Sequence, residues 1–314
     1  KKPGFFSTDW GLMLFEHRAF WLPKDVQNPN AYEDAFDVDG VRGLAAVCDG
    51  VSSTIFAGRW AAILAKAVVA DPPDVGSQDL REAWLKRTRD AWVQSIDEST
   101  LAWHQKPKML DGAGTTLLWI EIATDDAADG IARPYQLRAY SIGDCCLFHV
   151  RHGQVLQTFP IQDSARFESN PQVIRSVFKR GDVIEFEAME TQCRPGDLLV
   201  LCTDAVAGWT MRQLEAGATL DWNAYWDMSL EEWQQWLIGL RQQNQIRYDD
   251  STAVLLWLGG EVPTIRPLES KQEDRLLDTA EAKLKDAIGS LKGSLRKGLR
   301  ELSESKWLKE SGKK

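Results

Sequence analysis

The sequence has few of the residues that build familiar metal and nucleophile sites. It contains only four histidines, and none of them has the spacing of a zinc motif. The G-x-S-x-G motif that presents a nucleophilic serine is absent, and so is the G-x-x-x-x-G-K loop that binds nucleotide phosphates. These absences argue against zinc, serine-hydrolase and P-loop chemistry.

Cysteine is also scarce, and its five residues are an odd number. Three of them lie inside strongly apolar runs, where a free thiol behaves as a small hydrophobic group. We therefore expect a reduced, cytoplasmic protein. No apolar run is long enough to span a bilayer, and no apolar stretch with a small-residue cleavage site opens the sequence, so we expect neither a membrane anchor nor a signal peptide.

Charge is distributed unevenly along the 314 residues. Residues 266–314 contain 13 basic and 9 acidic side chains, a net charge of +4, which leaves −13 on residues 1–265. An acidic body repels the phosphate backbone of nucleic acids, so we expect it to bind neither DNA nor RNA. The hydrophobic fraction of 44% is ample for a buried core in one large domain or two small ones.

The sequence pattern changes between Pro263 and Pro267, and we expect a domain boundary there, with a body at 1–265 and a tail at 266–314. In the tail, apolar residues recur at spacings of three, four and seven: Leu277, Leu284, Ile288, Leu291, Leu295, Leu299 and Leu302. This narrow stripe in a Lys-rich segment predicts a basic amphipathic helix. Such a helix suits docking to a partner, to an anionic surface or to the acidic body itself.

Short apolar runs bounded by Gly, Asp or Pro predict β-strands at 11–15, 43–48, 115–122, 135–142, 146–150, 196–202 and 251–258. A turn at His152-Gly153 predicts a hairpin into Val155. Helix formers with start and stop signals predict helices at 56–69, 80–103 and 230–243. This mixed order favours a layered sheet sandwich with flanking helices over a strict βαβα alternation.

The fourteen tryptophans are numerous enough to suggest a binding platform. Six of them occupy helix-face positions, which favours packing in the core: Trp60, Trp84, Trp92, Trp103, Trp233 and Trp236. Trp209 follows Asp204 closely, and it either packs in the core or lines a substrate cleft.

Four aspartates lie at the edges of predicted strands among small residues: Asp49, Asp144, Asp204 and Asp249. Carboxylates at strand ends can converge, although Asp-Gly and Gly-Asp are also ordinary turn dipeptides. A cluster of carboxylates stays ionised only when cations neutralise it, and hard oxygen ligands favour Mg²⁺ or Mn²⁺. The four positions therefore indicate a candidate metal site.

These aspartates belong to a series of short sequence blocks that follow one another along the chain. The blocks are Tyr32-Glu33-Asp34-Ala35-Phe36, Val47-Cys48-Asp49-Gly50, Gly114-Thr115-Thr116, Ser141-Ile142-Gly143-Asp144, and Gly196 to Asp204 followed by Asp249 to Val254. Together they resemble the motifs of the protein phosphatase 2C family of metal-dependent phosphatases, over most of residues 8–258. The resemblance implies an α+β fold, a four-layer αββα sandwich whose two mainly antiparallel sheets surround a binuclear metal site, here with a C-terminal helical tail.

The resemblance also implies metal ligands at Glu33, Asp49, Gly50, Asp144, Asp204 and Asp249. Asp49 would bridge two Mn²⁺ or Mg²⁺ ions, with the Gly50 carbonyl as a further ligand and Glu33 acting through bound water. Asp204 and Asp249 would complete this catalytic centre. For Asp144 two readings stay open: it helps to hold a third, weaker ion, or it is a hydrogen-bond partner of the other ligands.

The implied activity is hydrolysis of phosphoserine and phosphothreonine on proteins by a metal-activated water, and a serine/threonine kinase is one expected partner. The sequence departs from the family at Val51-Ser52-Ser53, where the family usually has M-G-G, and at three single positions. Pro29 replaces an arginine that binds phosphate, Ala205 replaces a glycine, and Gly208 replaces an aspartate of the third metal site. The nearby arginines that could supply the missing cation are Arg18, Arg42 and Arg59. These departures motivate an alternative, a regulatory or binding module with weakened catalysis.

Overall fold

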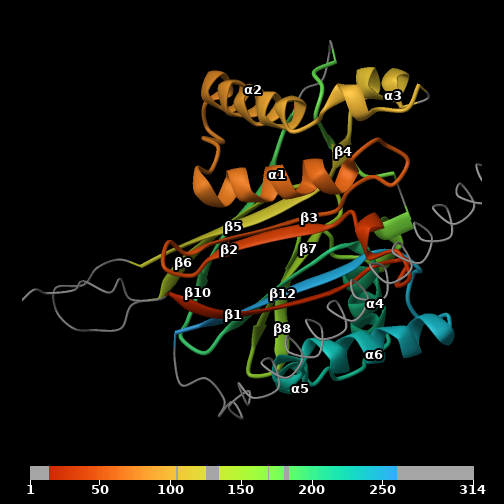
Figure 1. Ribbon diagram of the computed structural model, residues 1–314. Coiled ribbons are helices and arrows are strands. Elements are labelled where there is room, and N and C mark those ends of the chain that lie inside the picture. The colour runs from red at the N-terminus through yellow and green to blue at the C-terminus, as the bar shows by residue number, and fades with distance from the viewer. Residues whose placement is uncertain (1–13, 104, 125–133, 169, 180–183, 260–314) are drawn as a thin grey trace, which may run out of the picture. The chain divides into compact units, whose positions relative to one another are not determined.

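The computed structural model describes residues 14–103, 105–124, 134–168, 170–179 and 184–259 (Figure 1). Contacts divide the chain into two units, Lys1–Pro263 and Thr264–Lys314. The expected helical tail lies outside the described residues, so it stays a prediction, as does the boundary at 265. No helix among the described residues is both long enough and apolar enough to cross a bilayer.

Two five-stranded antiparallel sheets form the centre of the first unit. Sheet A has the order β1 (Phe15–Leu22), β12 (Ser251–Leu258), β11 (Leu198–Cys202), β7 (Cys146–Arg151), β8 (Gln154–Phe159). Sheet B has the order β10 (Glu187–Cys193), β6 (Tyr135–Ile142), β5 (Leu117–Ala123), β3 (Leu44–Cys48), β2 (Ala35–Asp39). A short ribbon pairs β4 (Gly114–Thr115) with β9 (Ile174–Arg175).

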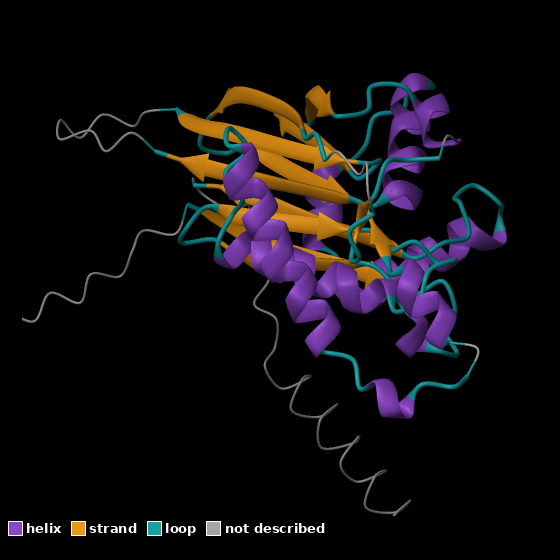
Figure 2. Cartoon of the chain, turned by 90° about the horizontal axis from the view of Figure 1, so that it is seen from above, coloured by secondary structure: helices purple, strands orange, loops and turns teal. Residues whose placement is uncertain are grey.

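Helices cover the outer faces of both sheets (Figures 1 and 2). On sheet B lies α1 (Ala57–Ala70), and α2 (Gln78–Gln94) packs on α1. On the side of sheet A lie α4 (Asp204–Glu215), α5 (Trp222–Asp227) and α6 (Leu230–Gln242). A short α3 (Lys106–Asp111) follows α2 along the chain. The expected four-layer αββα sandwich is therefore confirmed.

The hydrophobic core has three parts that correspond to the contacts between layers. One cluster joins the two sheets, a second joins sheet B to α1 and α2, and a third joins sheet A to α4, α5 and α6. Every residue of β3 and β11 is buried, because both faces of these strands are covered. This is why both strands appear in the sequence as continuous apolar runs instead of alternating ones.

Local signals explain where several elements begin. Ser229 and Glu232 form a reciprocal capping box at the start of α6, and Ser77 caps α2 by accepting a hydrogen bond from the Leu80 amide. The predicted hairpin at His152-Gly153 is confirmed, and both residues have positive φ. The strands predicted at 135–142 and 251–258 coincide with β6 and β12.

Other sequence expectations are wrong. The helix predicted over 80–103 ends at Gln94, because Asp97 accepts a hydrogen bond from the Ser99 amide and starts a separate 3₁₀ turn. Trp103 is 85% exposed, so it does not pack in the core as predicted. Of the strand predicted at 11–15, residues 11–13 lie outside the described residues, Leu14 precedes β1, and Phe15 is its first residue. The sequence reading missed β2, β9 (Ile174–Arg175), β10, α3, α4 and α5 altogether.

Candidate metal centre

The predicted carboxylates come together at one end of the two sheets. Asp49 follows β3 and Asp204 follows β11, while Asp249 lies two residues before β12 and Asp144 lies in the turn between β6 and β7. The register pairs Cys202 at the end of β11 with both the start of β7 and the start of β12. Together with burial, the negative charges of Asp204, Asp144 and Asp249 raise the pKa of Asp49, which shows that the four side chains lie close together.

The Gly114-Thr115-Thr116 block positions Asp49 through its backbone. The Thr116 amide and the Thr115 hydroxyl donate to the Asp49 carbonyl oxygen at 2.9 and 2.7 Å. The Asp49 amide in turn donates to the Thr116 hydroxyl at 3.2 Å. The two threonines thus fix the main chain on which the Asp49 carboxylate and the Gly50 carbonyl are presented.

Gly50 lies against the backbone of Glu33, the other expected ligand. A Cβ atom on Gly50 would lie 2.5 Å from the Glu33 carbonyl oxygen, and one on Gly58 of α1 would lie 2.6 Å from the Tyr32 carbonyl oxygen. Residues 32 and 33 therefore run in van der Waals contact with two glycine backbones. This close approach brings Glu33 beside Asp49 and requires glycine at position 50.

Two further aspartates hold the site together, and the sequence reading assigned them no role. Asp250 accepts a hydrogen bond from the Glu33 amide at 2.7 Å and another from the Lys24 amide at 2.5 Å. Asp34 accepts from the hydroxyls of Thr203 and Thr252 at 2.9 and 2.6 Å. The signal that could have revealed them is their position beside Glu33 and Asp249 inside the acidic blocks.

The electrostatics of the cluster favour a bound cation. Burial, followed by the neighbouring carboxylates, raises the pKa of Asp49 and raises that of Asp144 to about 7. Burial also raises the pKa of Asp204, whose Oδ1 is buried without a hydrogen-bond partner among the described residues. An oxygen-only set of this kind, with an orphaned carboxylate oxygen, fits hard divalent cations such as Mn²⁺ or Mg²⁺.

Two basic side chains face these acids. The Arg247 guanidinium donates to Oδ2 of Asp204, and the Lys24 ammonium lies 3.1 Å from Oδ1 of Asp249. Neither residue was considered from the sequence, which offered Arg18, Arg42 and Arg59 as candidate cations.

Those three arginines contact other parts of the molecule. Arg18 stacks over the Trp226 ring at 5.6 Å, and Arg42 donates to the Val69 carbonyl oxygen at 2.6 Å. Arg59 donates to the Ser95 carbonyl oxygen at 2.7 Å.

The family departures at the start of α4 have simple structural consequences. Ala205 lies in the first turn of the helix, where no positive φ is needed, so its methyl group is compatible with the fold. Gly208 is buried one turn further on and offers no side-chain oxygen near Asp144. Trp209 is 6% exposed and stacks edge-on against Trp236, so it packs in the core.

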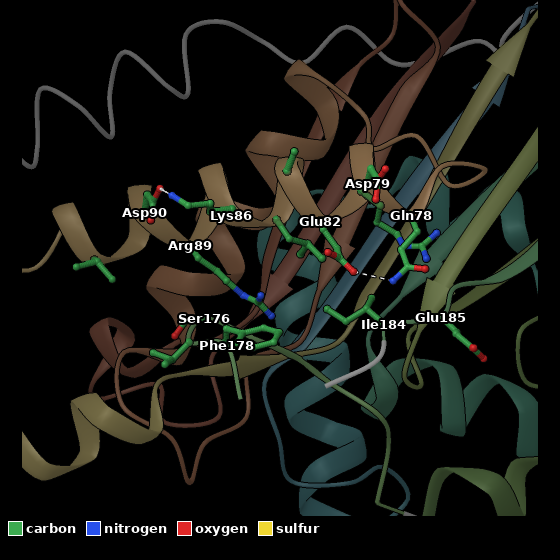
Figure 3. A pocket seen from close by; sticks show the side chains of 15 residues that line it. Gln78, Asp79, Glu82, Lys86, Arg89, Asp90, Ser176, Phe178, Ile184 and Glu185 are labelled. Carbon is green, nitrogen blue, oxygen red and sulfur yellow. Dashed lines mark hydrogen bonds and ion pairs between the residues drawn. The ribbon is translucent and has the colours of Figure 1, made fainter. Parts of the chain in front are cut away.

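Two cavities differ in their relation to these acids. One of about 450 Å³ is lined by Asp144 together with Gly143, Arg166 and Glu185. A larger one, about 750 Å³, runs along α2 beside Ser176 and Phe178 (Figure 3). None of the predicted ligands lines the larger cavity, so the smaller one is the better candidate for a substrate cleft despite its size.

A second cluster, His149, Cys193 and Asp197, has metal-like geometry but a different explanation. Asp197 already accepts two hydrogen bonds from Arg151, both at 2.7 Å, and one contact from His149 at 2.8 Å. Burial raises the pKa of the Cys193 thiol to about 12, so it stays protonated at neutral pH. This cluster is a satisfied buried ion pair rather than a metal site.

Comparisons with known proteins agree with this geometry. The family model described as "Protein phosphatase 2C" matches residues 26–245. The manganese-bound catalytic domain of the serine threonine protein phosphatase PstP superimposes with a TM-score of 0.51 and 16% identity, covering 78% of this chain and 99% of that one. No curated protein sequence matches.

Two further solved structures are similar over an equal share of the chain. The phosphatase PstP/Ppp from Mycobacterium tuberculosis has a TM-score of 0.47 and 20% identity, covering 78% of this chain and 99% of that one. Stp1 from Staphylococcus aureus has a TM-score of 0.47 and 13% identity, with coverage of 78% and 96%. At these identities the structural likeness describes the fold.

Proposed function

The chain belongs to the protein phosphatase 2C family and is a protein serine/threonine phosphatase, and from this premise we propose that it hydrolyses phosphoserine and phosphothreonine with two bound Mn²⁺ or Mg²⁺ ions. The observation that carries the proposal is that Asp49, Asp204 and Asp249 lie close enough for the charges of the other two to raise the pKa of buried Asp49, and that Oδ1 of Asp204 is buried without a hydrogen-bond partner among the described residues. Three carboxylates in this arrangement are a minimal binuclear site for hard cations.

Each residue has a distinct part in this proposal. Asp49, the Gly50 carbonyl, Asp204 and Asp249 would hold the two ions, and Glu33 would act through bound water. When bound, two such ions lower the pKa of a water molecule and stabilise the charge that develops in an in-line displacement. Thr115 and Thr116 hold the Asp49 backbone in place, so that the bridging carboxylate is positioned before substrate binds.

The proposed substrate is a phosphorylated protein, and a serine/threonine kinase is one expected partner. The cavity beside Asp144 supports this, because it offers room for a peptide segment next to the acids. The cavity lining also carries Arg166, Glu185 and Glu187, polar groups suited to peptide recognition. A cytoplasmic location is proposed as well, on the ground that all five cysteines are free and buried.

Hydrolysis of p-nitrophenyl phosphate and of a phosphothreonine peptide by the full chain tests the proposal. Chelator-treated protein should be inactive, and added Mn²⁺ or Mg²⁺ should restore turnover. Asp204→Asn and Asp249→Asn should each lower kcat by at least about 10²-fold while the circular dichroism spectrum is unchanged. Asp90→Asn, which removes an exposed partner of Lys86 on α2, is the matched control and should behave as wild type.

The outcomes separate the two candidate functions. Full activity in metal-free protein would refute the mechanism. Tight Mn²⁺ binding by calorimetry without turnover on either substrate would instead support the regulatory or binding module. The second result is the one motivated by Pro29 and Gly208.

A further inference from the structure

Arg247 is a partly exposed cation in contact with the acid cluster. It lies in the connection between α6 and β12, two residues before Asp249, and its guanidinium donates to Oδ2 of Asp204. The side chain of Arg247 is 52% exposed, whereas that of Asp204 is 8% exposed. The guanidinium therefore has one edge on a buried carboxylate and the rest toward solvent.

The acids around Arg247 are the ones expected to hold metal. Asp204, and to a lesser extent Asp249 and Asp144, lie close enough to raise the pKa of the Arg247 guanidinium. A phosphate ester that reacts at an ion held by Asp204 would bring its phosphoryl oxygens within reach of Arg247, because the guanidinium contacts the same carboxylate. Position 29, from which a family member would supply such a cation, is Pro and offers none.

The shape of the side chain suits a phosphoryl group. A guanidinium presents five N–H donors in a planar fork that matches two phosphate oxygens at once. Among the described residues, the guanidinium of Arg247 donates a hydrogen bond to Asp204 alone, which leaves most of the fork available. A divalent ion bound to Oδ2 of Asp204 would compete with Arg247 for that oxygen. Ion binding would therefore free the guanidinium for another anion.

Lys24 is the other cation at the site, and it is tied down more closely. Its ammonium contacts Asp249 at 3.1 Å, while its amide donates to Asp250, the residue that also binds the Glu33 amide. Lys24 thus belongs to the loop that positions Glu33. It is also a point charge without a planar fork, so it is the weaker candidate for phosphate recognition.

We propose that Arg247 binds the phosphoryl group of the substrate in place of the arginine missing at position 29, and that Asp204 holds its guanidinium at the site until ion and substrate are bound. This inference rests on the proposed function. It assigns binding of the substrate's phosphoryl group to the loop between α6 and β12, next to Asp204.

Binding of inorganic phosphate to the Mn²⁺-loaded full chain, measured by calorimetry, tests this directly. Arg247→Ala should weaken phosphate binding by about ten- to hundredfold, the range expected for charge-assisted hydrogen bonds. The KM for p-nitrophenyl phosphate should rise by a similar factor. Arg247→Lys should restore part of the affinity because it keeps the charge but loses the fork.

Two comparison variants make the result specific. Arg87→Ala removes an exposed arginine paired with Asp71 on α2 and should change neither phosphate nor Mn²⁺ binding. Lys24→Ala should weaken phosphate binding less than Arg247→Ala does. Mn²⁺ affinity of Arg247→Ala, titrated without phosphate, should be equal to or tighter than that of wild type, because a competitor for Asp204 is gone.

Several results would overturn the inference. Unchanged phosphate affinity with tighter Mn²⁺ binding would mean that Arg247 only neutralises Asp204 in the metal-free protein. Weaker Mn²⁺ binding would make it a positioning residue for Asp204. If wild type binds phosphate but hydrolyses no ester, the proposed function fails, while the loss of phosphate binding in Arg247→Ala still supports the role of Arg247.

Discussion

Asp34 accepts a hydrogen bond of 2.6 Å from the Thr252 hydroxyl, across 218 positions of the sequence. The same carboxylate oxygen also accepts from Thr203, and the Thr252 amide donates to the Thr203 hydroxyl at 3.0 Å. The loop before β2 and the adjacent ends of β11 and β12 are thereby joined next to the proposed metal ligands Glu33 and Asp204. The spacing of Glu33 from Asp204 and Asp249 depends on this buried network.

Thr252→Val should therefore destabilise the metal-free protein by about 1–3 kcal/mol, because it removes one donor from a buried carboxylate without changing side-chain volume much. Urea denaturation in chelator measures the change. Thr88→Val is the control: this buried hydroxyl donates to the Trp84 carbonyl within its own helix, and its loss should cost about 1 kcal/mol or less. Equal losses in the two variants would contradict a special role for the network.

Gly50→Ala should weaken metal binding without removing any carboxylate. Its Cβ would lie 2.5 Å from the Glu33 carbonyl oxygen, so Glu33 must move away from Asp49. We expect at least about a tenfold loss of Mn²⁺ affinity in calorimetry, the lower end of the effect of disturbing the groups that orient ligands. Gly239→Ala, whose Cβ meets nothing within 4 Å in α6, is the control and should keep wild-type affinity. Unaltered metal binding in Gly50→Ala would show that Glu33 is not a ligand.

Asp144→Asn should lower activity less than Asp49→Asn, because loss of the bridging carboxylate dismantles both primary ion sites. Bound metal, counted by inductively coupled plasma analysis, should fall in the same order. Gly208 adds a reason, since position 208 has no side-chain oxygen to complete a third site with Asp144. If both variants lose the same amount of metal, Asp144 is a primary ligand.

Asp197→Asn should destabilise the protein at pH 7 by about 3 kcal/mol, as expected when one partner of a buried ion pair is removed. Burial alone would raise the pKa of Asp197, but hydrogen bonds from Arg151 and His149 hold it below its usual range. A carboxyl group with a depressed pKa stabilises the fold above its unfolded pKa of about 3.9 and loses that contribution as pH falls through the folded value.

The difference in free energy of unfolding between wild type and Asp197→Asn should accordingly be constant from about pH 5 to 7 and shrink only at more acidic pH. Urea titrations at a series of pH values measure it. Glu190→Gln, which removes the exposed partner of Arg138, is the control and should cost no more than about 1 kcal/mol. A stability difference that instead increases on acidification would contradict the lowered pKa of Asp197.

Deletion of residues 268–314 should leave p-nitrophenyl phosphate hydrolysis intact, since every residue assigned to the site lies before β12 ends. The deleted segment carries the predicted amphipathic helix, which we propose docks a partner or an anionic surface. Steady-state kinetics and thermal melting of the truncated chain measure its contribution. Loss of activity or of cooperative unfolding would assign the tail to the catalytic domain.

The sequence by itself determined several of the strands and the four aspartates. β6 and β12 could be predicted to the residue, because short apolar runs between turn residues have few other uses in a globular chain. Asp49, Asp144, Asp204 and Asp249 could be singled out because each follows or precedes such a run. Their order along the chain also carried the family resemblance, which the matched family model confirms.

Only the tertiary structure decided which cations face the site and which groups hold it together. Arg247 and Lys24 are separated by more than two hundred residues, and nothing local distinguishes them from Arg18, Arg42 and Arg59. Pairing across β1, β11 and β12 brings them to the same acids. Long-range register of this kind has no local sequence signal, since the hydrogen bonds that fix it join residues far apart in the chain.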